Sequence, residues 1–344
     1  MPQPGFFDLD DRFRKLDEKD PLIHLDQLIF WEAFRPTLKA VRSAGRKSTA
    51  GRKPFDEVLM FKVLVLQHLY NVSDDQIEYQ IRDRYSFCRF LGLNPSDVVP
   101  DAKTIWLFRE QLVKADLMKH LFFTFDVQLE DHGFQARKGQ IVDASFVDVP
   151  KQRNTREENT QIKKGETPKH FEDNPAVGAQ KDTDARWAKK NQETHFGYKD
   201  HIVIDNKNKL IRNYDVSSAE VHDSNHFEDL LTDNRCVDVW ADSAYHSEEH
   251  ESQLEVEGYR SQVHKKGKRN KPLTEREKKS NARKSKVRAR IEHVFGSMTN
   301  EQGGMYFRVI GLARNAVKIG MMNMVYNMRR FVTLCTRRAP GVYG

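Results

Sequence analysis

Three carboxylates at wide spacing are the residues of this sequence that could do chemistry together. Asp143 lies in GQIVDASFVDVP, a predicted strand with apolar residues on both faces, and Asp242 ends a second predicted strand, VDVWAD. Glu292 lies in a predicted helix, RARIEHVFG. A buried Asp is rare without a partner, and a bound cation would supply one. If the strands are neighbours and the helix lies on their edge, the three form an oxygen site of the kind that Mg²⁺ or Mn²⁺ prefers.

The chemistry of such a site is phosphodiester displacement, because two cations roughly 3.5–4 Å apart can hold the attacking and leaving oxygens. The chain has 50 Asp and Glu residues, so composition alone does not single out these three. Asp148 competes, but its parity places it on the other strand face. Asp238 also competes, but lies at the start of its strand. The alternatives are a hydrogen-bonded Asp at a strand end and a helix-surface ion pair between Arg288 and Glu292.

A basic arm, defined as residues 265–290, is the second chemical feature. It has 13 Lys and Arg residues against Glu275 and Glu277, so it carries +11 in a chain whose formal net charge is +7. The rest of the chain is therefore mildly acidic. This concentration of charge is typical of phosphate-backbone contact with nucleic acid, and the alternative is a solvated charged loop.

The elements that must position these residues fall into two groups. Apolar residues recur at helical spacing in four early segments: 25–41, 55–70, 73–93 and 100–129. Ser73 is a candidate helix start and Gly92 a candidate helix end. From residue 140 strands alternate with helices, which predicts an α/β domain. The predicted strands are 140–149, a hairpin of 195–206 and 209–219, 235–242 and 259–265; the predicted helices are 222–231, 246–258, 286–298 and 315–332. Residues 150–194 are polar without periodicity and are predicted to be a mobile insertion.

Several classes of protein are disfavoured by composition. No run of about 18 apolar residues exists, so no membrane span is predicted, and the polar N-terminus does not resemble a signal peptide. Cys88, Cys236 and Cys335 lie far apart, which fits a reducing cytoplasm. HSEEH, residues 246–250, fits the zinc-protease pattern H-x-x-E-H, but no third ligand is identifiable.

The order of these motifs resembles the DDE transposases of bacterial insertion sequences, in the group called IS-five, over nearly the whole chain. IVDASFV is similar to the first Asp strand of that group, DSAYHSEEHE to the second Asp motif, and RARIEHVFG to the Glu helix. The resemblance implies an α/β, RNase H-like catalytic domain, a mixed sheet flanked by helices, with Asp143, Asp242 and Glu292 as the metal-binding triad. Arg288 matches the arginine that precedes the Glu. Ser285 and Thr299 stand where relatives often have Tyr and Lys.

We therefore predict a DNA transposase that binds the terminal inverted repeats of an insertion sequence, cleaves the element ends and joins them to target DNA with two Mg²⁺ or Mn²⁺ ions. Residues 1–135 are the predicted all-α DNA-end-binding domain, 136–300 the catalytic domain, and 301–344 a C-terminal helix packing on it. The partner is double-stranded DNA, bound by a homodimer in the bacterial cytoplasm at the nucleoid. The alternative is a non-catalytic DNA-binding or regulatory protein. The predicted DNA contacts are Arg288, Arg290, Lys199, Lys265, Lys266, Lys268, Arg269 and Lys271; for Lys199 a solvated strand lysine is the alternative.

Overall fold

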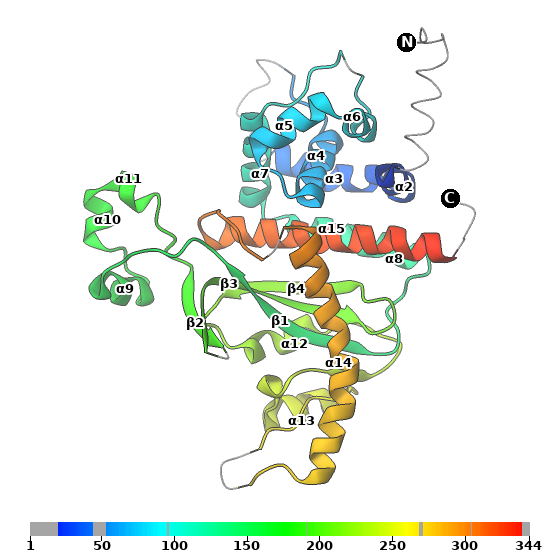
Figure 1. Ribbon diagram of the computed structural model, residues 1–344, viewed down its shortest axis with the longest axis vertical. Coiled ribbons are helices and arrows are strands. Elements are labelled where there is room, and N and C mark those ends of the chain that lie inside the picture. The colour runs from blue at the N-terminus through cyan, green and yellow to red at the C-terminus, as the bar shows by residue number, and fades with distance from the viewer. Residues whose placement is uncertain are drawn as a thin grey trace, which may run out of the picture. The chain divides into compact units, whose positions relative to one another are not determined.

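The computed structural model describes residues 20–43, 53–94, 96–190, 192–267, 271–303 and 305–338 (Figure 1). The chain forms two compact units, Met1–Gly133 with Met324–Gly344, and Phe134–Asn323. Residues 324–338 thus group with the N-terminal helices, while residues 312–323 belong to the second unit. The reason lies in α15 (Leu312–Arg338), where the ring of Phe331 packs edge-on against Phe125 and His132 at centroid distances of 6.0 and 5.0 Å. No helix in the described ranges is long and apolar enough to span a membrane.

Helices make up the regular structure of the described N-terminal residues: α2 (Pro21–Leu28), η1 (Trp31–Phe34), α3 (Arg35–Ser43), α4 (Glu57–Tyr70), α5 (Asp74–Asp83), α6 (Tyr85–Leu91), α7 (Ala102–Ala115) and α8 (Met118–Asp131). The four predicted helical segments are confirmed, but three are divided. Asp116, for example, ends α7 in the left-handed region at φ 51°. Ser73 caps α5 by accepting from the N–H of Gln76, and Gly92 ends α6 at φ 70°.

The centre of this unit is α4, which is buried along most of its length. Its Phe61 joins an aromatic cluster in which the Phe34 and Phe61 ring centroids are 4.9 Å apart and those of Trp31 and Phe90 are 5.5 Å apart. Burial of such rings removes large apolar areas from water and stabilises the helical unit. Trp31, Phe34 and Phe61 are therefore core residues rather than surfaces for stacking on bases, whereas Phe30, expected in the core with them, is 65 % exposed.

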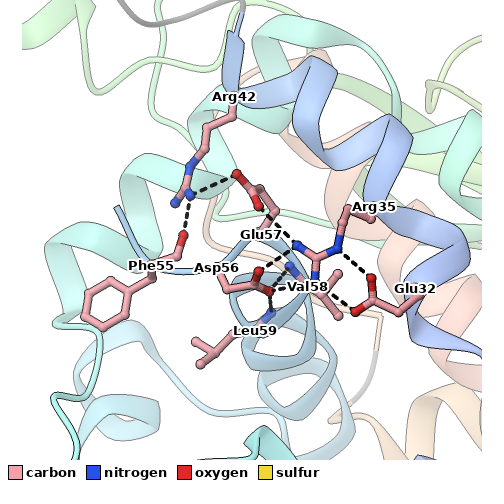
Figure 2. A network of polar contacts seen from close by, with 8 residues as sticks. All are labelled: Glu32, Arg35, Arg42, Phe55, Asp56, Glu57, Val58 and Leu59. Carbon is pink, nitrogen blue, oxygen red and sulfur yellow. Dashed lines mark hydrogen bonds and ion pairs between the residues drawn. The ribbon is translucent and has the colours of Figure 1, made fainter. Parts of the chain in front are cut away.

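Figure 2 shows a polar network that joins α3 to the beginning of α4. Asp56 caps α4 by accepting from the N–H groups of Val58 and Leu59 at 2.9 and 3.1 Å. Arg35 donates to Asp56 at 2.6 Å and to Glu32 at 2.5 Å. Arg42 pairs with Glu57 at 3.2 Å and donates to the carbonyl of Phe55. These arginines therefore stabilise the start of α4 and join it to α3.

The second unit is built on one mixed sheet, as predicted. Its strands are β1 (Gln140–Asp148), β2 (Arg186–Lys190), β3 (Glu193–Asp205), β4 (Ile211–Ser218), β5 (Asp238–Trp240) and β6 (Arg260–Ser261). β3 pairs antiparallel with β1 on one edge and with β2 and β4 on the other, which confirms the predicted hairpin. β5 pairs parallel with β1, and β6 parallel with β5. The two strands predicted to carry aspartates are therefore neighbours.

The two faces of the sheet have different partners. Val142, Val203 and Val239 face a core shared with α12 (Phe227–Leu230) and α13 (Glu248–Val256). Neighbouring residues of a strand point to opposite faces, so Asp143 and Asp200 lie on the other side. On that side α14 (Glu275–Glu301) packs against β1, as Figure 1 shows, and against β5, and Asp200 contacts α15.

Residues 150–194 contain more regular structure than was predicted. They form α9 (Arg156–Lys163), α10 (Lys169–Asp173), α11 (Pro175–Gly178) and the strand β2. Thr155 and Glu158 form a capping box at the start of α9. The buried Asp182 accepts from the Tyr198 hydroxyl at 2.7 Å and from the N–H of Ala185 at 3.0 Å, which ties the segment to the sheet. The segment predicted to be a mobile insertion therefore contains helices and a strand, and its mobility stays a prediction.

The basic arm is also more ordered than expected, because α14 begins at Glu275 rather than at the predicted residue 286. Thr274 and Glu277 form the capping box that starts the helix. Residues 275–290 of the arm are consequently the first part of a helix that continues past Glu292 to Glu301. The earlier half, from Lys265 to Leu273, precedes the helix.

Candidate active site

The backbone register brings Asp143 and Asp242 to the same level. In the β1–β5 pair Gln140 lies beside Val239 and Ile141 beside Trp240, so partners differ by 99 residues. Asp143 and Asp242 differ by the same 99, and the register continued past the end of β5 puts them side by side. Since paired strands are about 4.8 Å apart, the two carboxylates can share one site. Asp242 itself follows the strand and caps the short helix η3 (Ser243–Tyr245), accepting from the N–H of Ser243 at 2.5 Å.

Asp143 is held in a nearly buried position. One of its oxygens accepts from the N–H of Ala144 at 2.9 Å and the other from Nη1 of Arg288 at 2.5 Å. Burial has the largest effect and raises the pKa of Asp143. The Arg288 guanidinium opposes this rise, while the nearby charge of Asp242 adds to it. The carboxylate thus has a cationic partner, as its burial requires.

Asp242 is more open, and its neighbours favour the ionised form. Burial acts to raise the pKa of Asp242, but the Ser243 N–H and the charge of Arg288 outweigh it, so the pKa is lowered. Nδ1 of His264 lies 3.6 Å from the Asp242 carboxylate, and Nε2 of His264 lies 3.3 Å from the Ser285 hydroxyl. Burial lowers the pKa of His264, so this ring is a neutral partner at pH 7.

His264 is a site residue that the sequence did not indicate. It follows β6, and its N–H donates to the carbonyl of Ala241, one residue before Asp242. Only the pairing of β6 with β5 brings it there, and β6 has two residues. Ser285 contacts this histidine from α14.

Glu292 lies one helical turn after Arg288 on α14. Its carboxylate accepts from Nη2 of Arg288 at 3.1 Å, and its side chain is 60 % exposed. The predicted ion pair between these two residues is therefore present. Arg288 also contacts Asp143, so one guanidinium joins the carboxylate of β1 to that of α14.

The three carboxylates suit a hard divalent cation in donor type, because they supply oxygens and leave two negative charges uncompensated by Arg288. In the described part of the chain, no three His, Cys, Asp or Glu side chains already lie close enough together to hold an ion. The residues fit such an ion in chemistry, and Arg288 lies between two of these carboxylates.

The two competing aspartates have other roles. Asp238 accepts from Nε and Nη2 of Arg260 at 2.5 and 2.6 Å, and this pairing lowers the pKa of Asp238 to about 2. Asp148 lies on the opposite face of β1 from Asp143, as predicted, with Nδ1 of His195 at 3.3 Å. Neither carboxylate is directed to the site formed around Arg288.

The predicted DNA contacts differ in their availability. Nη1 of Arg290 donates to the carbonyl and side chain of Asn206 at 2.6 and 2.7 Å, although the residue is exposed. Lys265, Lys266 and Lys271 are exposed, and Lys265 also pairs with Glu277 at 3.3 Å. Lys268 and Arg269 lie outside the described residues.

Lys199 requires a correction. The residue is buried, and its ammonium donates to the carbonyl of Val221 and to Asp223, both at 2.7 Å. A buried lysine with two such partners stabilises the fold and is not presented to a phosphate. The sequence could not show this, because its partners follow more than 20 positions later.

The zinc-protease pattern does not form a metal site. His246 precedes Ser247, the N-cap of α13, so only His250 of the two histidines lies on the helix. Nδ1 of His250 is 3.0 Å from the carbonyl of Tyr245. The pattern therefore lacks the shared helix face that zinc binding would require.

Comparison with known proteins gives two family matches. A family model described as "Transposase DDE domain" matches residues 135–328, which is more than half of the chain. A second, described as "Transposase domain (DUF772)", matches residues 10–111. Among solved structures, the piggyBac transposase synaptic complex with hairpin DNA is similar, with a TM-score of 0.48 and 12% identity over 93% of this chain and 76% of that chain.

Proposed function

The chain belongs to the family of transposases with a DDE domain, and from this premise we propose that it mobilises a bacterial insertion sequence of the IS-five-like group. It binds the terminal inverted repeats, cuts the element ends and joins them to target DNA. The reaction takes place on the nucleoid in the cytoplasm. Pairing of two element ends calls for a homodimer in the DNA complex.

The proposed catalytic domain, residues 136–300, has an RNase H-like fold. The order of the sheet supports this assignment: three parallel strands, β1, β5 and β6, continue into the antiparallel β3 and β4. In such a sheet, carboxylates at neighbouring strand ends can meet a third from a packed helix. Residues 1–135 are the proposed end-binding domain, with α4 to α6 as its helix-turn-helix-like part.

The proposed ligands of two Mg²⁺ or Mn²⁺ ions are Asp143, Asp242 and Glu292. Transposases of this family use divalent ions, which when bound lower the pKa of water and stabilise charge on phosphodiester oxygens. Water attacks a phosphorus at the element end and releases a 3′-hydroxyl. That hydroxyl then attacks a target phosphodiester, forms the new P–O bond and releases a target 3′-hydroxyl. The first step hydrolyses one phosphodiester bond and leaves a 5′-phosphate on the flanking strand. The second exchanges one phosphodiester bond for another, so no other energy source is needed.

The other residues of the site orient the DNA. His264 contacts Asp242 and fixes the orientation of its carboxylate. Arg288 lies between the carboxylates, where phosphate oxygens would also be bound. Arg290, Lys265, Lys266 and Lys271 are exposed cations that can neutralise phosphates along the strand. Lys268 and Arg269 are assigned to the same role from their place in the basic arm.

The shared offset of 99 residues between the β1–β5 register and the two aspartates is the observation that carries this proposal. The test is cleavage and strand transfer of labelled element-end DNA, with and without Mg²⁺. Asp143→Asn, Asp242→Asn and Glu292→Gln should each reduce strand transfer by at least about a thousandfold while end binding remains. Asp148→Asn, on the same strand but the opposite face, is the matched control and should remain active.

The outcomes separate the proposal from its alternative. Near wild-type strand transfer by one of the three variants would remove that residue from the site. Specific end binding by the wild-type chain without any Mg²⁺-dependent cleavage would favour a non-catalytic DNA-binding or regulatory protein.

A further inference from the structure

Arg288 divides its guanidinium between two acids. Nη1 donates to Asp143 at 2.5 Å and Nη2 to Glu292 at 3.1 Å. Its Nε is buried and has no hydrogen-bond partner among the described residues. Arg260, by contrast, places Nε and Nη2 on the two oxygens of the single carboxylate of Asp238. Arg288 therefore has a less complete set of partners than an arginine in a permanent bidentate pair.

The two halves of this bridge differ in strength. The Asp143 side chain is 13 % exposed, so the loss of its cation without replacement would leave a buried charge unpaired. Glu292 is mostly exposed, and an ion pair with an exposed partner contributes little. Arg288 is thus held mainly by the need of Asp143 for a positive partner, and another cation could meet that need.

We propose that Arg288 is an exchangeable counter-ion, which pairs Asp143 and Glu292 until a divalent cation replaces it. This inference rests on the proposed function, since it takes these carboxylates as the metal ligands. One oxygen of Asp143 is occupied by the Ala144 N–H, and the other is the oxygen that Arg288 contacts. A cation bound there would lie within a few ångströms of the guanidinium, and two positive charges at that distance repel strongly. Binding of the ion and contact by Arg288 therefore exclude each other.

Exchange also follows from charge. Asp143 and Glu292 contact one guanidinium, and Asp242 lies near enough for its charge to interact with it, so the three carboxylates attract a further cation even while Arg288 is in place. A divalent ion neutralises more of this charge than Arg288 does. The displaced guanidinium is then free for a phosphate oxygen, which makes metal binding and DNA contact by this arginine successive events rather than independent ones.

The test is Mn²⁺ affinity of the full chain, measured by titration calorimetry after treatment with EDTA. Arg288→Gln removes the competitor and should bind Mn²⁺ at least about fivefold more tightly than the wild-type chain, the lower end of usual coupling between competing ligands. Arg283→Gln removes the same charge from an exposed position on the same helix and should leave the affinity within about twofold. Arg288→Lys keeps the charge but cannot contact both acids as a fork, so its affinity should fall between the two.

Thermal unfolding distinguishes an exchangeable arginine from one with a purely structural role, because only the first predicts that Mn²⁺ reduces the effect of the substitution on the unfolding temperature. In EDTA, Arg288→Gln should unfold at a lower temperature than the wild-type chain, because Asp143 loses its partner. Saturating Mn²⁺ should narrow this difference, since the ion takes the place of the guanidinium.

Each result bears on a distinct claim. Unchanged or weaker Mn²⁺ binding by Arg288→Gln, or an equal temperature difference with and without Mn²⁺, would overturn the exchange. Wild-type affinity in Arg288→Lys would mean that charge alone matters and would overturn the bridging role. Absence of Mn²⁺ binding by the wild-type chain and all variants would overturn the metal-dependent function itself, and the exchange with it.

Discussion

Asp200 should make the stability of this protein fall as the pH rises through neutrality. The residue lies in β3 and is fully buried. One carboxyl oxygen accepts from the side chain of Asn323 at 3.0 Å, and the other has no partner among the described residues. Burial raises the pKa of Asp200 from 3.8 to about 7, against the hydrogen bond from Asn323 and with a further rise from Asp215. The folded chain therefore holds this proton between about pH 4 and pH 7, where the unfolded chain does not.

The magnitude follows from the difference between the two pKa values. A carboxyl whose pKa is raised on folding contributes stability at low pH that is lost as the pH rises to the folded value. Between pH 5 and pH 7 this loss is about 3 kcal/mol, at 1.36 kcal/mol per unit, and beyond the folded pKa it stops growing. Asp200→Asn has a similar shape and no titration, and its amide nitrogen can occupy the position of the unpaired oxygen. The variant should therefore gain about 3 kcal/mol relative to the wild-type chain between pH 5 and pH 8.

Urea unfolding followed by circular dichroism at pH 5 and at pH 8 measures this change. With a slope of about 2–3 kcal/mol per molar, the midpoint of Asp200→Asn should move by on the order of 1 M relative to wild type between the two pH values. Asp238→Asn is the control, because the Arg260 hydrogen bonds lower the pKa of Asp238 to about 2. Asp238 is therefore ionised in both the folded and the unfolded chain throughout this pH range. For each variant the measured quantity is the urea midpoint minus that of the wild-type chain. If this difference is the same at pH 5 and pH 8 for Asp200→Asn, as it should be for Asp238→Asn, the reasoning is refuted.

Three further perturbations test other parts of the molecule. Replacing five basic-arm residues by alanine should reduce the slope of log DNA affinity against log salt concentration by about 0.9 for each phosphate that is no longer neutralised. The reduction should be equal for specific and random DNA. An unchanged slope would mean that the arm is a solvated loop. The five are Lys265, Lys266, Lys268, Arg269 and Lys271. Asp56→Ala removes the α4 cap and should lower the free energy of unfolding by about 1–2 kcal/mol in urea titrations. Gly139→Ala should cost more than about 2 kcal/mol, because its φ is +81° and a Cβ would lie 2.4 Å from the ring of Trp240. Gly165→Ala, at φ +79° with open space around it, should cost only about 1 kcal/mol, and equal costs would contradict the clash.

The elements of this chain that were predictable from the sequence are those with strong local patterns. The apolar residues on both faces of β1 indicate a buried strand, and α4 is continuous in its apolar content, so both were expected. Two helices begin in segments that were predicted to be irregular, and a sequence motif marks the start of each. Thr155 with Glu158 and Thr274 with Glu277 are capping boxes, a spacing that marks helix N-termini without any hydrophobic periodicity.

The parts that could not be predicted depend on contacts between distant segments. The register of β1 on β5 decides whether Asp143 and Asp242 meet, and spacing along the chain does not determine it. His264 reaches Asp242 only through a strand of two residues, too short for a pattern. Lys199 resembles an exposed strand lysine until Asp223 is folded against it.

The continuity of α14 has a consequence for where the proposed enzyme cuts. The helix runs unbroken from Glu275 to Glu301, and the 14 steps from Lys278 to Glu292 span about 21 Å at a rise of 1.5 Å each. Along B-DNA that length corresponds to about six base pairs. In the proposed enzyme, a rigid helix would therefore keep a constant distance between a DNA phosphate bound near its start and the phosphodiester bond cleaved beside Glu292. The length of this helix would then set the position of the cut relative to a backbone contact, rather than the bases at the cut.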